Sequence, residues 1–121
     1  MNSTNDVNFE NNVLKSEVPV VVDFYASWCG PCRVATSTLE NVEEGFKDKV
    51  KFLKIDIDLN SVVTEKQNIC ALPTIQIFNK GIMVKELVGI RNKELYVEAL
   101  NDVLVDKIDE TKTEFEVPEV A

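Results

Sequence analysis

The sequence predicts an α/β domain in which helices flank a partly parallel sheet. From residue 7 onward, helical and strand-like apolar patterns alternate along the chain. The run at residues 20–26 is apolar on both alternating faces except for Asp23, which is typical of a central strand covered on both sides. Strand-like runs at residues 74–78 and 82–88 flank a short connection that contains a glycine, which predicts a hairpin and an antiparallel edge.

The remaining elements follow from the spacing of apolar residues. Phe9, Val13 and Leu14 recur at helical spacing and predict a first helical segment before the central strand. After Cys32, apolar residues at intervals of four and three predict a longer helix. The pattern is completed by a strand at 50–57, a short helix with good capping residues at 60–67, and a final helix capped by Asn92.

The chain has 121 residues, of which 45% are hydrophobic, and this is enough for one domain with its own core. Its first twelve residues carry no basic residue and no apolar stretch, unlike a signal peptide, and no apolar run is long enough to cross a bilayer. We therefore expect a cytoplasmic location, where thiols stay reduced. Residues 106–121 contain six acids and two bases, so we predict a domain at residues 1–108 and an acidic, solvated and flexible extension at residues 109–121.

The composition argues against several classes of function. The formal net charge of -8 argues against nucleic acid as a partner, since phosphate binding needs a basic surface. Histidine is absent, which removes Ser-His-Asp and Cys-His catalysis together with every imidazole metal ligand. Three cysteines are a low and odd number, which does not fit the disulfide framework of a small secreted protein.

The motif Trp-Cys-Gly-Pro-Cys, at residues 28–32, follows the central strand. Cys29 is expected at the start of the next helix, where unpaired backbone N–H groups and the helix dipole stabilise a thiolate, the nucleophilic form. Cys32 lies one turn further on the same helix face, so its sulfur can reach that of Cys29. Pro31 fits the first helical turn, and Trp28 is expected to shield the pair. The pattern indicates a redox-active cysteine pair.

Two other interpretations of the cysteine pair are weaker. A zinc site needs four ligands, and Cys70 together with a carboxylate would have to complete it, because the chain has no histidine. Two unrelated buried thiols would leave the neighbouring Trp28 and the intervening Gly-Pro without an explanation.

These residues resemble the thioredoxin family. The segment DFYASWCGPC is followed in order by KIDID, LPT, NKG and LVG, and the similarity extends from Phe9 to Leu104. The resemblance implies a thioredoxin fold, in which helices flank a central mixed sheet. Only the polar segment MNSTND is available for the family's first edge strand, so we expect this strand to be short or missing.

The resemblance also implies roles for four residues. Cys29 is expected to be the attacking thiol and Cys32 the resolving thiol. Asp23 matches the family's buried aspartate, which can take a proton from Cys32 as a general base, and burial should raise the pKa of its carboxyl. Lys54 matches the family's lysine on the neighbouring strand, which can partner this acid. Alternatively, Asp23 is an acid at a strand edge that reaches solvent.

By the same resemblance, Pro73 matches the family's cis-proline, whose backbone would pair with an extended substrate beside the cysteines. Gly89 matches the glycine that keeps the adjacent surface low. We expect a shallow apolar docking surface made of Trp28, Gly30, Pro31, Leu72, Pro73, Gly89 and Ile90. Cys70 is expected to be an inert thiol, either in a loop or partly buried, with a regulatory or dimer-forming thiol as the alternative.

The implied activity is the reduction of protein disulfides by a monomer that needs no bound cofactor. Its expected partners are disulfide-containing client proteins and an NADPH-dependent thioredoxin reductase, which would regenerate the dithiol. An oxidant or isomerase with the same fold is an alternative, although such domains tend to have histidine between the cysteines and an export signal. A non-catalytic interaction subunit that uses the docking surface as a clamp is the alternative from a different class.

Overall fold

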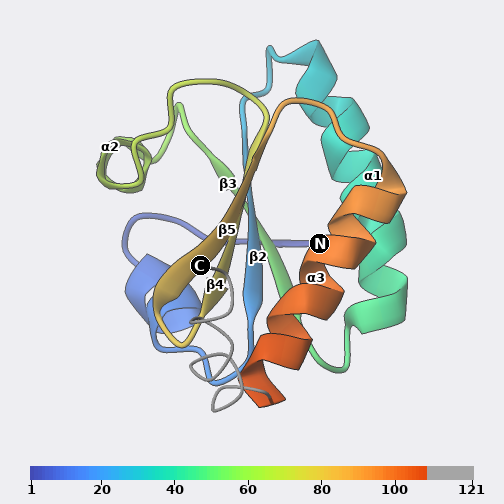
Figure 1. Cartoon of the computed structure of the whole chain (residues 1–121). Coiled ribbons are helices and arrows are strands. Elements are labelled where there is room, and N and C mark those ends of the chain that lie inside the picture. Colours follow the sequence, from blue (N-terminus) through green and yellow to red (C-terminus); the bar gives the residue numbers. More distant parts are fainter. Residues whose placement is uncertain (109–121) are drawn as a thin grey trace, which may run out of the picture.

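The computed structural model describes residues 1–108 as a five-stranded sheet between two layers of helices (Figure 1). The strands are β1 (Asn2–Ser3), β2 (Val20–Tyr25), β3 (Lys51–Asp56), β4 (Thr74–Asn79) and β5 (Ile82–Val88). The helices are η1 (Glu10–Leu14), α1 (Gly30–Phe46), α2 (Ser61–Lys66) and α3 (Lys93–Ile108). The predicted extension at residues 109–121 lies outside the described residues, so the boundary of the domain stays a prediction.

The sheet is mixed, with the strand order β1-β3-β2-β4-β5. β1, β3 and β2 run parallel, whereas β4 pairs antiparallel with both β2 and β5. The predicted hairpin and antiparallel edge are therefore confirmed. β1 has two residues and pairs Asn2 with Leu53, so the expectation of a short first edge strand is confirmed as well.

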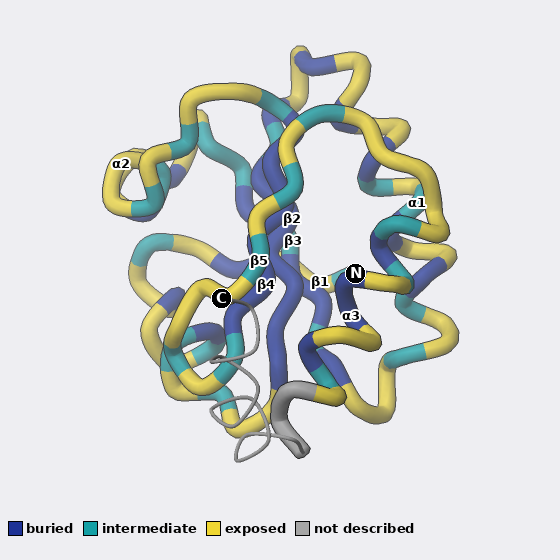
Figure 2. Tube along the Cα trace, viewed as in Figure 1, coloured by how far each residue is buried: buried dark blue, intermediate teal, exposed yellow. Residues whose placement is uncertain are grey.

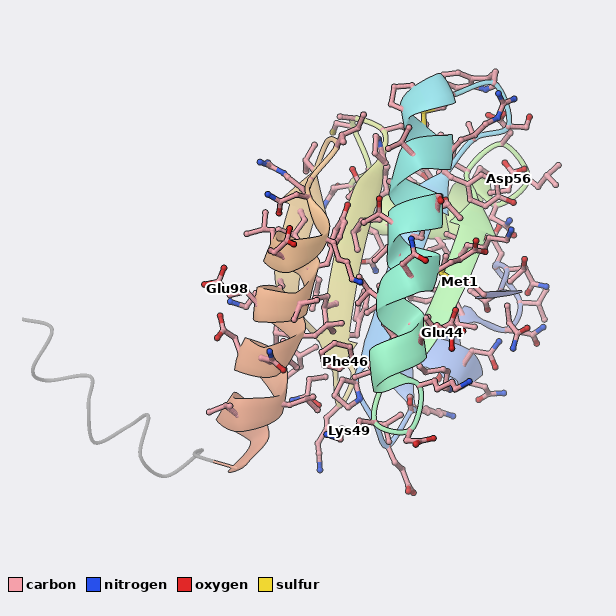
Figure 3. All side chains as sticks on the ribbon, turned by 90° about the vertical axis from the view of Figure 1, so that its right-hand side faces the viewer. Met1, Glu44, Phe46, Lys49, Asp56 and Glu98 are labelled. Carbon is pink, nitrogen blue, oxygen red and sulfur yellow. A yellow bond between two sulfur atoms is a disulfide. The ribbon has the colours of Figure 1, made fainter. Side chains whose placement is uncertain are left out.

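β2 lies at the centre of the sheet, and this position explains its sequence. Residues 20–24 are at most 1% exposed, because helices cover both faces of the strand (Figure 2). Val20, Val22 and Phe24 belong to the core on the side of η1 and α2, whereas Val21 belongs to the core beneath α1 and α3. Since side chains alternate along a strand, Asp23 shares the face of Val21. Figure 3 shows α1 and α3 side by side across this face.

Capping contacts set where two of the helices begin. Asn92 Oδ1 accepts a hydrogen bond from the Leu95 N–H at 3.0 Å, so the predicted cap of the last helix is confirmed. The cap of α2 differs from the local prediction: the Asp6 carboxylate accepts hydrogen bonds from the N–H groups of Val62 and Val63, at 3.2 and 2.8 Å. Asp6 is distant in the sequence, so the pattern around α2 could not reveal it.

The first helical segment is shorter than a regular α-helix. η1 is a five-residue π-helical turn, and Val13 within it and Phe9 just before it are both buried. Both side chains therefore pack inward, as the helical spacing predicted. Within residues 1–108, no helix is long and apolar enough to cross a membrane.

Candidate active site

β2 passes into α1 at the end of the sheet that is uppermost in Figure 1, and the cysteine motif occupies this junction. Cys29 is the N-cap of α1, and Cys32 lies in its first turn. A disulfide joins the two residues, whose Cα atoms are 5.3 Å apart. The two cysteines thus form a redox pair rather than the zinc ligands or separate thiols considered as alternatives.

The start of α1 supplies a hydrogen-bond donor to Cys29. The Cys32 N–H donates to Cys29 Sγ at 3.2 Å. Pro31 in the first turn has no N–H that would be left unpaired. In the reduced protein, the Cys32 N–H and the positive end of the helix dipole would both favour a negative charge on Cys29 Sγ.

A hollow of about 480 Å³ opens beside Cys29, and we call it the Cys29 hollow. Four of the predicted docking residues line it, namely Trp28, Gly30, Pro31 and Leu72. The sequence did not indicate the other lining residues, which are Ile57, Ile69, Cys70 and Ala71. These come from the end of β3 and from the loop before β4, so only the tertiary structure brings them beside the cysteines.

The other three predicted docking residues, Pro73, Gly89 and Ile90, do not line the Cys29 hollow. They lie next to it, because Pro73 follows the lining residue Leu72 in the chain. The Leu72–Pro73 peptide bond is cis, as the resemblance implied. The Gly89 N–H donates to the Pro73 carbonyl oxygen at 2.8 Å, which ties the two segments together. Gly89 has a φ of +86°, and its missing Cβ would meet no atom within 4 Å, so a side chain there would project from the surface. Ile90, next along the chain, is 53% exposed.

Trp28 is 69% exposed, yet its ring is held in place. Its Nε1–H donates a hydrogen bond to Asp58 Oδ2 at 2.8 Å. Asp58 was not identified from the sequence, because it follows β3 and lies 30 residues further along the chain. The hydrogen bond keeps the indole at the rim of the Cys29 hollow.

Asp23 is fully buried, so the alternative of an acid that reaches solvent is wrong. Burial raises the pKa of its carboxyl to about 6, because a charge is removed from water. A hydrogen bond from Thr36 Oγ1 to Asp23 Oδ2, 2.6 Å long, and the charge of Lys54 oppose this rise, whereas Glu40 adds to it. Asp23 Oδ1 has no hydrogen-bond partner among the described residues.

Lys54 lies opposite Asp23 in the parallel pairing of β2 with β3. Its ammonium group is 5.6 Å from the centre of the Tyr25 ring and, within the described part of the chain, forms no ion pair with Asp23. Lys54 therefore acts on Asp23 through its charge and not through a direct contact. The direct partner is Thr36, which the sequence did not indicate.

A second hollow, of about 460 Å³, opens beside Cys32, and we call it the Cys32 hollow. Its lining is mostly polar or charged and comprises Tyr25, Ala26, Ser27, Cys32, Arg33, Thr36, Ser37, Glu40 and Lys54. Cys29 lines only the first hollow and Cys32 only the second. The two cysteines of the pair thus line different hollows.

The paired cysteines on a mixed α/β sheet define a class of protein, the dithiol–disulfide oxidoreductases. Comparison with known proteins gives the family, because the thioredoxin family model matches residues 1–102. The chain is 40% identical to a thioredoxin of Rickettsia bellii over 97 residues. These residues make up 80% of this chain and 92% of that protein. It is 40% identical to a thioredoxin of Alicyclobacillus acidocaldarius over 99 residues, which make up 82% of this chain and 93% of that protein. The chain therefore belongs to the thioredoxin family.

A relative whose name places it in the chloroplast is also similar. The chloroplastic M-type thioredoxin of Chlamydomonas reinhardtii is 36% identical over 102 residues, which cover 84% of this chain and 73% of that protein. Membership of this family, together with the intact cysteine pair, makes the chain a protein-disulfide oxidoreductase and not a non-catalytic interaction subunit.

Proposed function

We propose that the chain reduces disulfides in client proteins, with Cys29 as the attacking thiol and Cys32 as the resolving thiol. The observation that carries this assignment is the position of the two sulfurs. Cys29 lines the open, largely apolar hollow and accepts a hydrogen bond from the Cys32 N–H. Cys32 is 2% exposed, compared with 6% for Cys29, and lines the second hollow, whose residues are mostly polar or charged. A client disulfide that enters the Cys29 hollow therefore meets Cys29 first.

The reaction consists of two thiol–disulfide exchanges. The Cys29 thiolate attacks one client sulfur, a mixed disulfide forms, and the other client sulfur leaves as a thiolate. Asp23 then takes the proton of the Cys32 thiol, and the Cys32 thiolate attacks Cys29 Sγ. The Cys29–Cys32 bond forms, the bond to the client breaks, and the client leaves with both sulfurs reduced. The pKa of Asp23, which burial raises to about 6, suits the acceptance of a proton near neutral pH.

The client docks on the Cys29 hollow and on the segments that adjoin it. Trp28 and Leu72 supply apolar contacts beside the sulfur, and exposed Ile90 extends them beyond Gly89. The backbone on the Leu72 side of the cis bond is the part of this surface that would pair with an extended client strand, because Pro73 has no N–H and its carbonyl oxygen accepts from Gly89. Gly89 leaves this part of the surface unobstructed, because any side chain there would project into the space that the client occupies.

Turnover needs an electron donor, since the cycle ends with the Cys29–Cys32 disulfide. On the strength of the family, we assign this role to an NADPH-dependent thioredoxin reductase. A reductant of client proteins works best where other thiols are kept reduced, so the location that we propose is the cytoplasm. Both sulfurs and both hollows belong to one chain, and a monomer is therefore sufficient.

Trapping of clients tests the assignment of the two cysteines. Both variants carry Cys70→Ser, because Cys70 is an exposed thiol in the lining of the Cys29 hollow. In a cell extract, Cys32→Ser should accumulate mixed disulfides with clients, since it attacks but cannot resolve. Cys29→Ser should trap almost nothing. Equal trapping by both variants on a non-reducing gel would contradict the assignment.

A measured reduction potential tests whether the chain acts as a reductant or as an oxidant. The reduction potential of the Cys29–Cys32 pair should be well below that of disulfide isomerases. A potential of about -180 mV or higher would place the chain among oxidants or isomerases instead.

A further inference from the structure

Thr36 connects two features of the site that would otherwise be separate. Its hydroxyl donates a hydrogen bond of 2.6 Å to Asp23 Oδ2, and its side chain lines the Cys32 hollow. Asp23 itself does not line that hollow. Thr36 follows Cys32 by four residues on α1, so the two side chains lie on the same helix face. Thr36 is thus the contact between the buried carboxyl and the hollow that Cys32 faces.

We propose that Thr36 is a positioning residue for the resolving step: its hydroxyl holds Asp23 Oδ2 and leaves Oδ1 as the oxygen that takes the proton of Cys32. The inference rests on the proposed roles of Asp23 and Cys32. Two observations favour it beyond the hydrogen bond itself. Asp23 Oδ1 is buried and has no partner among the described residues, so it is free to accept a proton. Thr36 also lies on the same face of α1 as Cys32, so the hydroxyl that holds Oδ2 comes from the helix face that carries the resolving thiol.

The same hydrogen bond adjusts the pH range in which the carboxyl acts as a base. Burial raises the pKa of Asp23, and the charge of Glu40 on α1 raises it further. The donor from Thr36 and the charge of Lys54 on β3 lower it. Among the described residues, two phenols also interact with Asp23, those of Tyr25 on β2 and Tyr96 on α3. Burial is the main cause of their raised pKa values, and the charge of Asp23 adds to it.

Without the Thr36 hydroxyl, only the charge of Lys54 opposes the effect of burial. The carboxyl then holds its proton to a higher pH. A protonated Asp23 cannot accept the proton of Cys32, so fewer molecules can resolve the mixed disulfide near neutral pH.

The proton and the electrons balance in this step. Cys32 gives its proton to Asp23 Oδ1, the Cys32–Cys29 bond forms, and the electron pair of the broken bond leaves on the client sulfur. The carboxylic acid afterwards returns its proton to water, and the polar Cys32 hollow is the nearest open space that Thr36 reaches. Thr36 neither gains nor loses a proton over the cycle.

Three variants on α1 separate the effect of the Thr36 hydroxyl from the effect of changing a side chain on this helix. Thr36→Val keeps the shape of the side chain and removes the hydroxyl, whereas Thr36→Ser restores a hydroxyl. Thr38→Val is the matched control, because the Thr38 hydroxyl donates to the Val34 carbonyl oxygen at 3.0 Å and does not contact Asp23.

Each variant is characterised by an NMR titration and by a kinetic assay. Carbon-13 NMR titrates the Asp23 carboxyl directly. Stopped-flow absorbance follows the reduced proteins, all carrying Cys70→Ser so that this exposed thiol does not react, with excess dithiobis(nitrobenzoate) between pH 5 and pH 8. Attack by Cys29 releases one thionitrobenzoate, and attack by Cys32 on the mixed disulfide releases a second, so the two steps appear as separate phases.

In Thr36→Val, both the carboxyl titration and the acid limb of the second phase should move up by about one pH unit, which is the order of a hydrogen bond to a charged group. At pH 6 the second phase should then be about fivefold slower, while the first phase keeps its rate. Thr36→Ser and Thr38→Val should both behave like the parent protein.

Other results would overturn the inference in distinguishable ways. An unchanged carboxyl titration in Thr36→Val would show that the hydroxyl does not control Asp23. A shifted titration with an unchanged second phase would show that Asp23 is not the base, but it would leave Cys29 as the attacking thiol. If Cys29→Ser kept the first phase, the proposed function itself would fail, and the inference with it.

Discussion

Replacing Asp23 with asparagine tests whether the buried carboxyl lowers stability at neutral pH. Its pKa in the folded protein is about 6, compared with about 3.9 for aspartate in an unfolded chain. The folded state therefore binds the proton more tightly than the unfolded state does. The stability that this binding contributes is complete below about pH 4 and is lost as the pH rises toward 6. A difference of about two pKa units corresponds to about 3 kcal/mol.

Asparagine has nearly the same shape as aspartate, does not titrate, and can still accept the hydrogen bond from Thr36. The stability of Asp23→Asn minus that of the parent should therefore rise by about 3 kcal/mol between pH 4 and pH 7 and stay level above that. The assay is urea unfolding of the oxidised proteins, followed by circular dichroism at a series of pH values. Asp48→Asn, which removes an exposed acid of the same charge, is the matched control.

A difference between Asp23→Asn and the parent that is the same at every pH would refute the reasoning. It would mean that the carboxyl has the same pKa in the folded and unfolded states. If Asp48→Asn showed an equally large dependence on pH, the cause would be the net charge of the protein and not the burial of Asp23.

Four further predictions concern two glycines, a helix cap and the C-terminal extension. Gly81 has a φ of +83°, and a Cβ there would lie 2.9 Å from the Leu14 carbonyl oxygen, so Gly81→Ala should destabilise the protein by about 1–3 kcal/mol in urea unfolding. Gly45→Ala, at an open position of α1, should instead stabilise it by about 0.5–1 kcal/mol. Asn92→Ala removes the cap of α3 and should cost about 1 kcal/mol; unchanged stability would contradict the cap. Deletion of residues 109–121 should leave the melting temperature and the rate of insulin disulfide reduction nearly unchanged, and a large fall in either would show that the extension supports the domain.

The sequence by itself determined the features that depend on neighbouring residues. β2 could be predicted because both of its alternating faces are apolar, which requires a covered central strand. The meeting of Cys29 and Cys32 could be predicted because three residues span about one helical turn. The cap at Asn92 was also visible, because its acceptor and its donor are three residues apart.

The tertiary structure decided the contacts that join distant parts of the chain. Asp58 holds Trp28 from the end of β3, and Thr36 on α1 holds Asp23 on β2. Lys54 was expected to partner Asp23, but its ammonium group lies over the Tyr25 ring. No local pattern shows where a sheet and its helices will bring two such atoms together. A raised pKa of Asp23 was expected, but its value of about 6 has the same tertiary origin, because the free energy of a buried charge depends on every group that surrounds it in the folded protein.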